Sequence, residues 1–336
     1  MKSVITFGEL MLRLSPEGHL RFPQANSFHA YYGGAEANVA IALAQFGIPV
    51  SYVTALPTND LGTAALNAVR QFGIDTKHVV RKDGRLGVYY CETGYSQRAS
   101  QVIYDRANSV FAQSKPDDYD WDAIFQGASW YYLTGITPAL SPILAEMVIF
   151  SAKKAKEHGV KVAFDLNYRR SLWPAGEARK FYDTLCPLVD LCFTNLYQTK
   201  DIFGLALDPK DPEDPEAHAV AASYLTEHFG ISEVAFSTRR SPSANVNTIS
   251  GYLYANGKLS RAKTYSMDIV DRVGGGDAFG AALLTAKEKG LSAKQAIDCA
   301  VAASCLKHSV EGDYLVASWD EVTALAFGTG DTLIKR

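Results

Sequence analysis

Residues 130 to 307 alternate short apolar segments with longer segments of helical period. The runs 130–135, 161–166, 191–195 and 233–237 are apolar and of strand length. The segments between them carry apolar residues at the spacing of one helix face. Strands joined by crossover helices pair in parallel. The sequence therefore predicts an α/β fold with a doubly wound, mostly parallel sheet, whose ligands bind beyond the carboxyl ends of the strands.

The same periodicity sets the expected elements along the whole chain. Helices are expected at 35–46, 62–72, 142–158, 178–188, 215–229, 277–289 and 293–307. Further strands are expected at 3–8, 50–56 and 79–81, and residues 251–254 and 262–265 are expected to form an edge pair.

Two stretches do not fit the alternation of strands and helices. Residues 9–33 consist of short segments broken by Pro16, Gly18 and Pro23, which suits small strands better than a helix. Residues 85–112 have β-branched and aromatic runs on both sides of the polar turn TGYSQRAS, a hairpin pattern. We expect the two stretches to form a small β-sheet lid on a single domain that spans residues 1–336.

Charge and cysteine content narrow the class of protein. The net charge is −3, with 33 basic and 36 acidic side chains, so no nucleic-acid partner is expected. No apolar run approaches the ~18 residues that would cross a membrane, and Glu9 interrupts the N-terminal apolar stretch before it resembles a secretory signal. The five cysteines contain no CxxC pair, which favours reduced thiols. We expect a cytoplasmic protein without a membrane partner.

The segment from Asp271 to Phe279, DRVGGGDAF, is the strongest indication of function. The glycines Gly274, Gly275 and Gly276 let the backbone approach an anion closely, and a helix that begins near Asp277 would point its free N–H groups at that anion. On this segment alone, Asp277 is explained equally well as a helix cap or as a catalytic carboxylate. Its place near residue 275 and its GGGDAFG spelling differ from a dinucleotide GxGxxG turn, and no Lys-Ser or Lys-Thr follows as in a Walker loop.

A second glycine segment lies near the N-terminus. Gly33 and Gly34 precede an alanine-rich helix in the run GGAEANVA, and Asn38 lies one turn inside that helix. By itself this run indicates a tight turn followed by close helix packing.

Together, GGAEANVA and DRVGGGDAF resemble the ribokinase-like, or phosphofructokinase-B, family of carbohydrate kinases, and the resemblance covers essentially the whole chain. The resemblance implies ATP and magnesium as cofactors, with Asp277 as the base and Gly274, Gly275 and Gly276 as an anion hole. It also implies a lid that closes over the sugar and a homodimer or higher oligomer formed through that lid. The metal ligands stay unassigned. The nucleotide contacts that the resemblance implies are Asn167, Asn195, Ser237, Arg239, Gly274 and Gly276.

Two runs depart from the family pattern. Where the family has Asn-x-x-Glu, this chain has Asn195-Leu-Tyr-Gln198, and glutamine carries no charge to organise a metal. Where the family has glycines near the nucleotide, this chain has the run 237–243, STRRSPS. A catalytically weakened sugar-binding homologue therefore remains an alternative to an active kinase.

Three further runs resemble one branch of the family, the 2-keto-3-deoxygluconate kinases: DLNYRR at 165–170, VIYDR at 102–106 and TGITPAL at 134–140. An arginine fork matches the carboxylate of an acidic sugar, although a lone arginine is more often a surface ion-pair residue. Asp313 is equally explained as a turn residue. The substrate contacts implied by this similarity are Gly34, Asn38, Tyr89, Tyr104, Arg106, Ile136, Arg169, Asp277 and Asp313. The similarity predicts phosphorylation of 2-keto-3-deoxygluconate at its 6-hydroxyl; a fructokinase or ribokinase type is the alternative.

Overall fold

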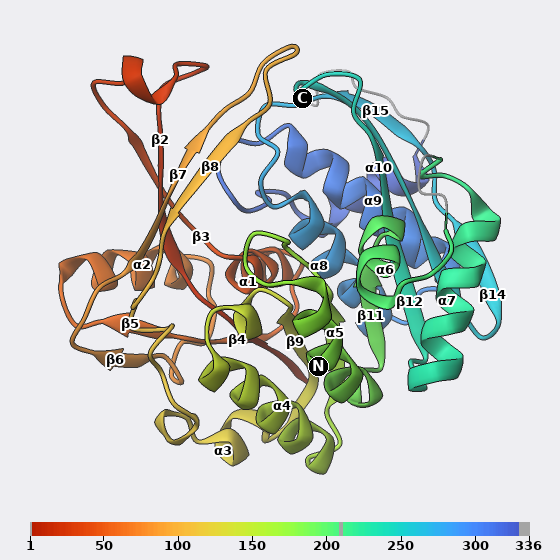
Figure 1. Ribbon diagram of the computed structural model, residues 1–336, viewed down its shortest axis with the longest axis horizontal. Coiled ribbons are helices and arrows are strands. Elements are labelled where there is room, and N and C mark those ends of the chain that lie inside the picture. Colours follow the sequence, from red (N-terminus) through yellow and green to blue (C-terminus); the bar gives the residue numbers. More distant parts are fainter. Residues whose placement is uncertain (1, 208–210, 329–336) are drawn as a thin grey trace.

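The computed structural model describes residues 2–207 and 211–328. Its centre is a nine-stranded sheet in the order β14-β13-β12-β11-β10-β9-β1-β4, with β15 beside β13 (Figure 1). The strands are β1 Ser3–Phe7, β4 Val50–Val53, β9 Ala128–Thr134, β10 Lys161–Asp165, β11 Leu191–Thr194, β12 Glu233–Arg240, β13 Val246–Ala255, β14 Lys258–Arg261 and β15 Tyr265–Asp268. The strands from β4 to β12 pair in parallel, and β13, β14 and β15 pair antiparallel at one edge. The predicted doubly wound, mostly parallel sheet is confirmed.

Helices cover both faces of this sheet. The helices are α1 Ala35–Gln45, α2 Asp60–Arg70, α3 Trp121–Phe125, α4 Pro142–Glu157, α5 Ala175–Leu185, α6 Leu196–Phe203, α7 Pro215–Phe229, α8 Gly275–Glu288, α9 Ala293–His308 and α10 Trp319–Phe327. Short 3-10 turns lie at Phe22–Gln24, Pro116–Asp118, Thr137–Ala139 and Cys186–Leu188. Alternate residues of β9 explain the two layers: Tyr132 packs with α1, α8 and α9, whereas Tyr131 packs with α4 and α5 on the other face.

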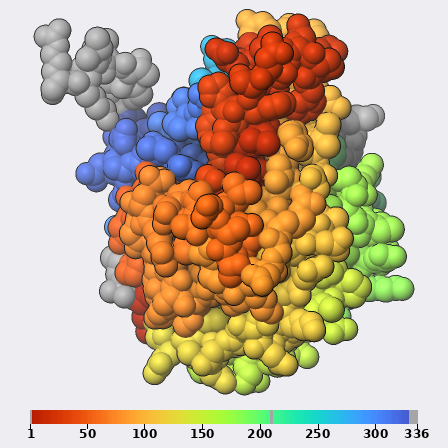
Figure 2. Space-filling view, turned by 90° about the vertical axis from the view of Figure 1, so that its left-hand side faces the viewer, coloured from red at the N-terminus to blue at the C-terminus, as the bar shows by residue number. Residues whose placement is uncertain are grey.

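A small second sheet stands apart from the main one. Its order is β3-β2-β7-β8, with β2 Met11–Ser15, β3 His29–Gly33, β7 Gly87–Glu92 and β8 Gln101–Asp105. The pair β2–β7 is parallel and the two outer pairs are antiparallel. This sheet rises from the body of the molecule at the upper left of Figure 1, and its N-terminal part projects at the top of Figure 2. The structure thus contains the small sheet expected outside the main fold.

Several expected elements were wrong in their extent. The strand expected at 50–56 divides into β4 and β5 (Ala55–Pro57), and β5 pairs with β6 (Val80–Lys82) in a separate two-stranded sheet. The expected edge pair 251–254 with 262–265 was also wrong, because the edge of β13 is shared between β14 and β15. Asn256 and Gly257 both have positive φ and form the two-residue turn between β13 and β14.

Three helices were not expected, namely α3, α6 and α10. Strand β12 continues to Arg240, so the first part of the run 237–243 is strand and not loop. Within the described part of the chain, no helix is long and apolar enough to cross a membrane. All five cysteines are free thiols.

Candidate active site

One large cavity opens where the parallel strands end beneath the small sheet. Its volume is about 620 Å³. Strands β7 and β8 of the small sheet supply one wall, and the segments that follow β10 and β11, together with the start of α8, supply the other. The sequence-predicted site residues that line it are Gly34, Asn38, Tyr89, Tyr104, Arg106, Ile136, Asn167, Arg169, Asn195, Ser237, Arg239, Gly274, Gly275, Gly276, Asp277 and Asp313. The fold therefore brings every one of these residues to a single cavity.

The start of helix α8 excludes one of the two interpretations of Asp277. Gly274 is the N-cap residue, with φ +81, and α8 begins at Gly275. Asp277 lies inside the first turn, and its carboxylate accepts a hydrogen bond of 2.7 Å from the side-chain amide of Asn38. The interpretation of Asp277 as the helix cap is wrong. Its carboxylate instead faces the cavity.

Gly274 and Gly34 are required by close backbone packing. A Cβ atom on Gly274 would lie 1.7 Å from the backbone oxygen of Asp313, and one on Gly34 would lie 1.9 Å from the backbone oxygen of Glu9. The first turn of a helix has backbone N–H groups without intrahelical partners and carries the positive end of the helix dipole. This glycine-lined helix start fits a phosphate group.

Asp277 is buried, with 9% of its surface exposed. Burial raises the pKa of its carboxyl from 3.8 to about 7, and the hydrogen bond from Asn38 opposes this rise only in part. The neighbouring carboxyls of Asp165, Glu36 and Asp313 raise the pKa further by repulsion. A carboxyl that titrates near neutral pH is suited to accept a proton as a general base.

Two further carboxyls line the cavity, those of the buried Glu36 and the half-buried Asp165. Burial raises the pKa of Glu36 to about 7 and that of Asp165 to about 6. Glu36 accepts hydrogen bonds from the hydroxyls of Thr134 (2.7 Å) and Thr137 (3.3 Å). Sequence reasoning gave Glu36 no role, and its place in the GGAEANVA run was the available signal.

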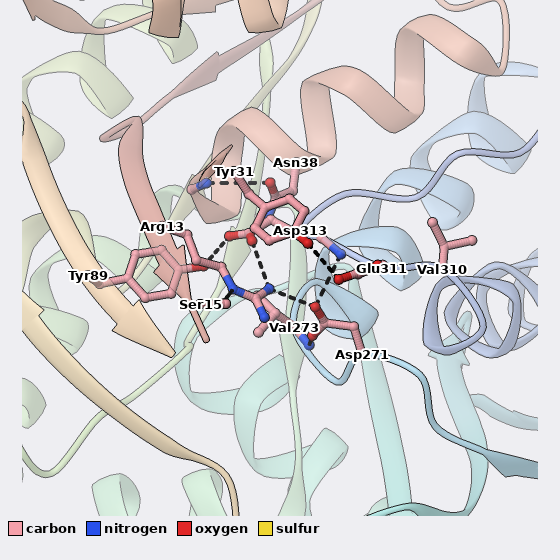
Figure 3. A network of polar contacts seen from close by, with 12 residues as sticks. Arg13, Ser15, Tyr31, Asn38, Tyr89, Asp271, Val273, Val310, Glu311 and Asp313 are labelled. Atoms are coloured by element: carbon pink, nitrogen blue, oxygen red, sulfur yellow. Dashed lines mark hydrogen bonds and ion pairs between the residues drawn. The ribbon is translucent and has the colours of Figure 1, made fainter. Parts of the chain in front are cut away.

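Asp313 belongs to a buried ionic cluster that joins the small sheet to the main fold (Figure 3). Its carboxylate accepts hydrogen bonds from the Tyr89 hydroxyl and, at 3.0 Å, from Arg13 Nη1. Arg13 also pairs with Asp271 at 2.8 Å. The carboxylate of Asp313 thus does more than close a turn. Arg13 was not found from the sequence, where no motif marks it.

The two arginines assigned to the acidic end of a substrate differ in their partners. Arg106 donates from Nε to Glu9 at 2.7 Å and lies 5.5 Å from the ring centre of Tyr104. Arg169 is exposed to the cavity, and its guanidinium donates a hydrogen bond of 3.3 Å to the backbone oxygen of Tyr168. Within residues 2–207 and 211–328, no carboxylate pairs with Arg169, so its fork is available to a ligand.

The residues assigned to the nucleotide line the same cavity. Asn195 caps α6, where its side-chain oxygen accepts a hydrogen bond of 3.0 Å from the backbone N–H of Gln198. Asn167 follows β10 with φ +36. The guanidinium of Arg239 contacts His308 Nε2 at 2.8 Å. Burial lowers the pKa of Arg239 to about 10.

Nδ1 of His308 forms a hydrogen bond with the backbone oxygen of Ser304. Burial lowers the pKa of His308 to about 4. A neutral ring protonated on Nδ1 can accept from Arg239 and hold it toward the cavity. Arg240, in contrast, pairs with Asp211 away from the cavity. Among the described residues, no three His, Cys, Asp or Glu side chains are grouped closely enough to hold a metal ion.

The comparison with protein families agrees with this geometry. The model of the pfkB family carbohydrate kinases matches residues 1–320. The chain belongs to the pfkB family of carbohydrate kinases. A 2-dehydro-3-deoxygalactonokinase of Haloferax volcanii is 34% identical over 99% of both chains, and a 2-dehydro-3-deoxygluconokinase of Thermoproteus tenax is 27% identical over 93% of this chain and 90% of the relative.

The fold of this pfkB-family kinase is also that of solved relatives. The structure of a 2-dehydro-3-deoxygluconokinase from Thermotoga maritima superposes with a TM-score of 0.94 and 42% identity, over 97% of this chain and 98% of that chain. The resemblance to the ribokinase-like family, and within it to the 2-keto-3-deoxygluconate kinases, is confirmed.

Proposed function

We propose that this kinase transfers the γ-phosphoryl group of ATP to the 6-hydroxyl of a 2-keto-3-deoxy sugar acid, with 2-keto-3-deoxygluconate as the leading substrate. One observation carries the proposal. A buried carboxylate with a pKa of about 7 lies beside a glycine-lined helix start, in the same cavity as an arginine whose fork pairs with no described carboxylate. These are a base, an anion site and a carboxylate-binding group.

Asp277 supplies the base. Its ionised carboxylate accepts the proton of the attacking hydroxyl while that oxygen forms a bond to the γ-phosphorus and the bond to the β-phosphate oxygen breaks. The donated hydrogen bond from Asn38 fixes one carboxylate oxygen, which leaves the other oxygen for the sugar hydroxyl. The proton then passes to solvent, and ADP leaves with the charge of the broken bond.

The first turn of α8 supplies electrostatic stabilisation. The backbone N–H groups of Gly275 and Gly276, at the positive end of the helix, would stabilise the negative charge of the migrating phosphoryl group. Donors fixed by the backbone need no rearrangement during the reaction, which is the main source of their effect.

ATP would arrive with magnesium as one substrate. The polar groups of Asn167, Asn195, Ser237 and Arg239 line the cavity and suit phosphate and ribose oxygens. Magnesium would neutralise charge on the phosphates when bound. Because Gln198 replaces the family's glutamate, we expect the metal to be held mainly by the phosphates and water.

The acidic end of the sugar would bind at Arg169, with Arg106 beside it. Arg106 already pairs with Glu9, whereas Arg169 is exposed and forms an ion pair with no carboxylate of the described residues. Tyr89 and Tyr104, whose rings lie 5.7 Å apart, would provide an apolar wall and hydroxyl groups. A neutral sugar would gain little from this arginine.

Arg169→Ala should therefore separate acidic from neutral sugars. We expect KM for the sugar acid to rise about 30-fold, the value of one charge-assisted hydrogen-bond pair of ~2 kcal/mol. The kcat/KM for fructose or ribose should change little. Steady-state kinetics measure both. Arg170→Ala is the matched control, because Arg170 pairs with Asp201 and does not line the cavity. Equal losses for both variants would contradict the proposed role.

The proposed substrate is tested by coupled ADP release over a panel of sugars. The panel should contain 2-keto-3-deoxygluconate, its galactonate epimer, fructose and ribose. The two sugar acids differ only in the configuration of one hydroxyl, so their kcat/KM ratio measures selectivity between them. Turnover of fructose or ribose without turnover of either acid would favour the neutral-sugar alternative. No turnover of any sugar, with ATP and sugar still binding, would favour the weakened homologue.

We further propose that residues 9–33 and 85–112 act as a lid on a single kinase domain, and that a second copy of the chain pairs through this lid in a cytosolic homodimer. The edge strand β8 exposes Val102, Ile103 and Tyr104 at 40%, 48% and 51%. An uncovered apolar edge of this length favours a partner of the same kind. Ile103→Asp should shift the protein toward monomer in sedimentation velocity. Ile143→Asp, at an exposed isoleucine on α4, should not.

A further inference from the structure

Arg13 is an unusual residue to find inside a small sheet. It lies in the middle of β2, and only 2% of its surface is exposed. A buried guanidinium is costly unless charged groups compensate it. The partners of Arg13 should therefore indicate why the chain keeps it.

Both ionic partners of Arg13 come from the other end of the sequence. Its Nη1 pairs with Asp271 at 2.8 Å and with Asp313 at 3.0 Å, and its Nε donates to the hydroxyl of Ser15 at 2.8 Å. Both carboxylates are buried. Figure 3 shows the guanidinium between the two carboxylates, with the ring of Tyr31 close by.

Asp271 holds the glycine loop in place. One oxygen accepts a hydrogen bond of 3.0 Å from the backbone N–H of Val273, at the start of the loop. The other accepts one of 3.1 Å from the backbone N–H of Gly312. The carboxylate that Arg13 neutralises thus joins the glycine loop to the segment around Gly312.

Asp313 contacts the same loop through its backbone. Its backbone oxygen lies where a Cβ of Gly274 would be, so the two segments are in direct contact. Its carboxylate binds Tyr89 on β7 of the small sheet. Tyr31, on β3, donates its hydroxyl hydrogen to Glu311. The small sheet is therefore tied to the segment 311–313 at three strands.

We propose that Arg13 is a positioning residue that holds the glycine loop, and hence the amides of the proposed anion hole, in register with the small sheet. The guanidinium fixes Asp271 and Asp313 together, and these two side chains fix the loop. Arginine is suited to this task because its Nη1 bonds both carboxylates while its Nε donates to the hydroxyl of Ser15. A lysine would supply the charge but not the additional hydrogen bond from Nε. The inference rests on the proposed role of the loop in phosphoryl transfer.

The test compares Arg13→Gln and Arg13→Lys with the wild-type kinase. We expect Arg13→Gln to lower kcat at least about 30-fold, because small misplacements of catalytic groups have effects of this size. KM for ATP should change less than about threefold, since the ground-state contacts remain. Arg13→Lys should recover part of kcat. Thermal unfolding of each variant reports the folded fraction, to which kcat is normalised.

Chemical rescue distinguishes positioning from simple loss of folding. In Arg13→Ala, millimolar guanidinium should restore kcat by refilling the space between the two carboxylates. A folding defect would not be relieved, because guanidinium does not stabilise folded proteins. Arg98→Ala is the control: Arg98, in the turn between β7 and β8, also pairs with a carboxylate, that of Glu92, and does not line the cavity. Its kcat should stay within about twofold of wild type and should not respond to guanidinium.

Two results would overturn the inference. One is a normalised kcat of Arg13→Gln within threefold of wild type. The other is an Arg13→Ala defect that guanidinium does not relieve. These failures are distinct from failure of the proposed function, which would appear as missing turnover in the wild-type kinase.

Discussion

Replacing Asp277 with asparagine is expected to lower kcat about 1,000-fold, within the range found for loss of a general base. The asparagine amide cannot accept the proton of the sugar hydroxyl. Its carbonyl oxygen can still accept the hydrogen bond from Asn38, so the local packing is retained. Steady-state ADP release with the best sugar acid measures the effect. Turnover within tenfold of wild type would remove Asp277 from the mechanism.

Stability supplies the control for Asp277→Asn. The pKa of Asp277 is about 7 in the folded protein against an ordinary 3.8, so the fold binds this proton more tightly than the unfolded chain does. The stabilisation from this group is therefore present at acid pH and is lost as the pH rises toward 7. Asparagine does not ionise, so the variant does not lose this stability at high pH. It should melt at the same or a higher temperature than wild type at pH 8. A loss of kcat then cannot come from unfolding.

The same carboxyl should set the acid limb of the wild-type pH profile. The base must be ionised, and kcat/KM reports the ionisation of the free enzyme. We expect kcat/KM to fall about tenfold per pH unit below pH 7. The residual activity of Asp277→Asn should lack this limb.

The fold could be predicted because buried parallel strands have a plain sequence signature. Strands such as β10 and β11 are covered on both faces, so they appear as short apolar runs between helices. The edge of the sheet was harder to predict. There the Asn256-Gly257 turn sends the chain back after ten residues of β13, so the partner strand begins at Lys258 and not at residue 262.

The site could be predicted where the chemistry is local. Gly274 and Asp277 lie in one short segment, and their spacing carries the family pattern. Arg13 has no such segment. In Met11–Ser15 the odd-numbered residues are buried, which alternation alone could indicate, but which face is covered depends on Asp271 and Asp313 across the fold.

Gly274→Ala is expected to reduce both activity and stability, and the reasons can be separated. Gly274 has φ +81, a conformation that costs an alanine about 1–2 kcal/mol. Its Cβ would also lie 1.7 Å from the backbone oxygen of Asp313, which cannot move aside as a flexible side chain can. The loop must therefore shift, and we expect kcat to fall at least about 100-fold.

Gly290→Ala isolates the first of these two costs. Gly290 follows α8 with φ +71, and no described atom outside its neighbours lies within 4 Å of its built Cβ. Gly290→Ala should show only the conformational cost of alanine at this φ, as a modest drop in Tm, and should keep wild-type kcat. Gly274→Ala should melt lower than Gly290→Ala, because the collision with Asp313 adds to the same strain. If the two variants had equal Tm and equal kcat, the contact between the glycine loop and Asp313 would not be what places the anion site, and the tie from Arg13 through Asp313 to that site would lose its physical basis.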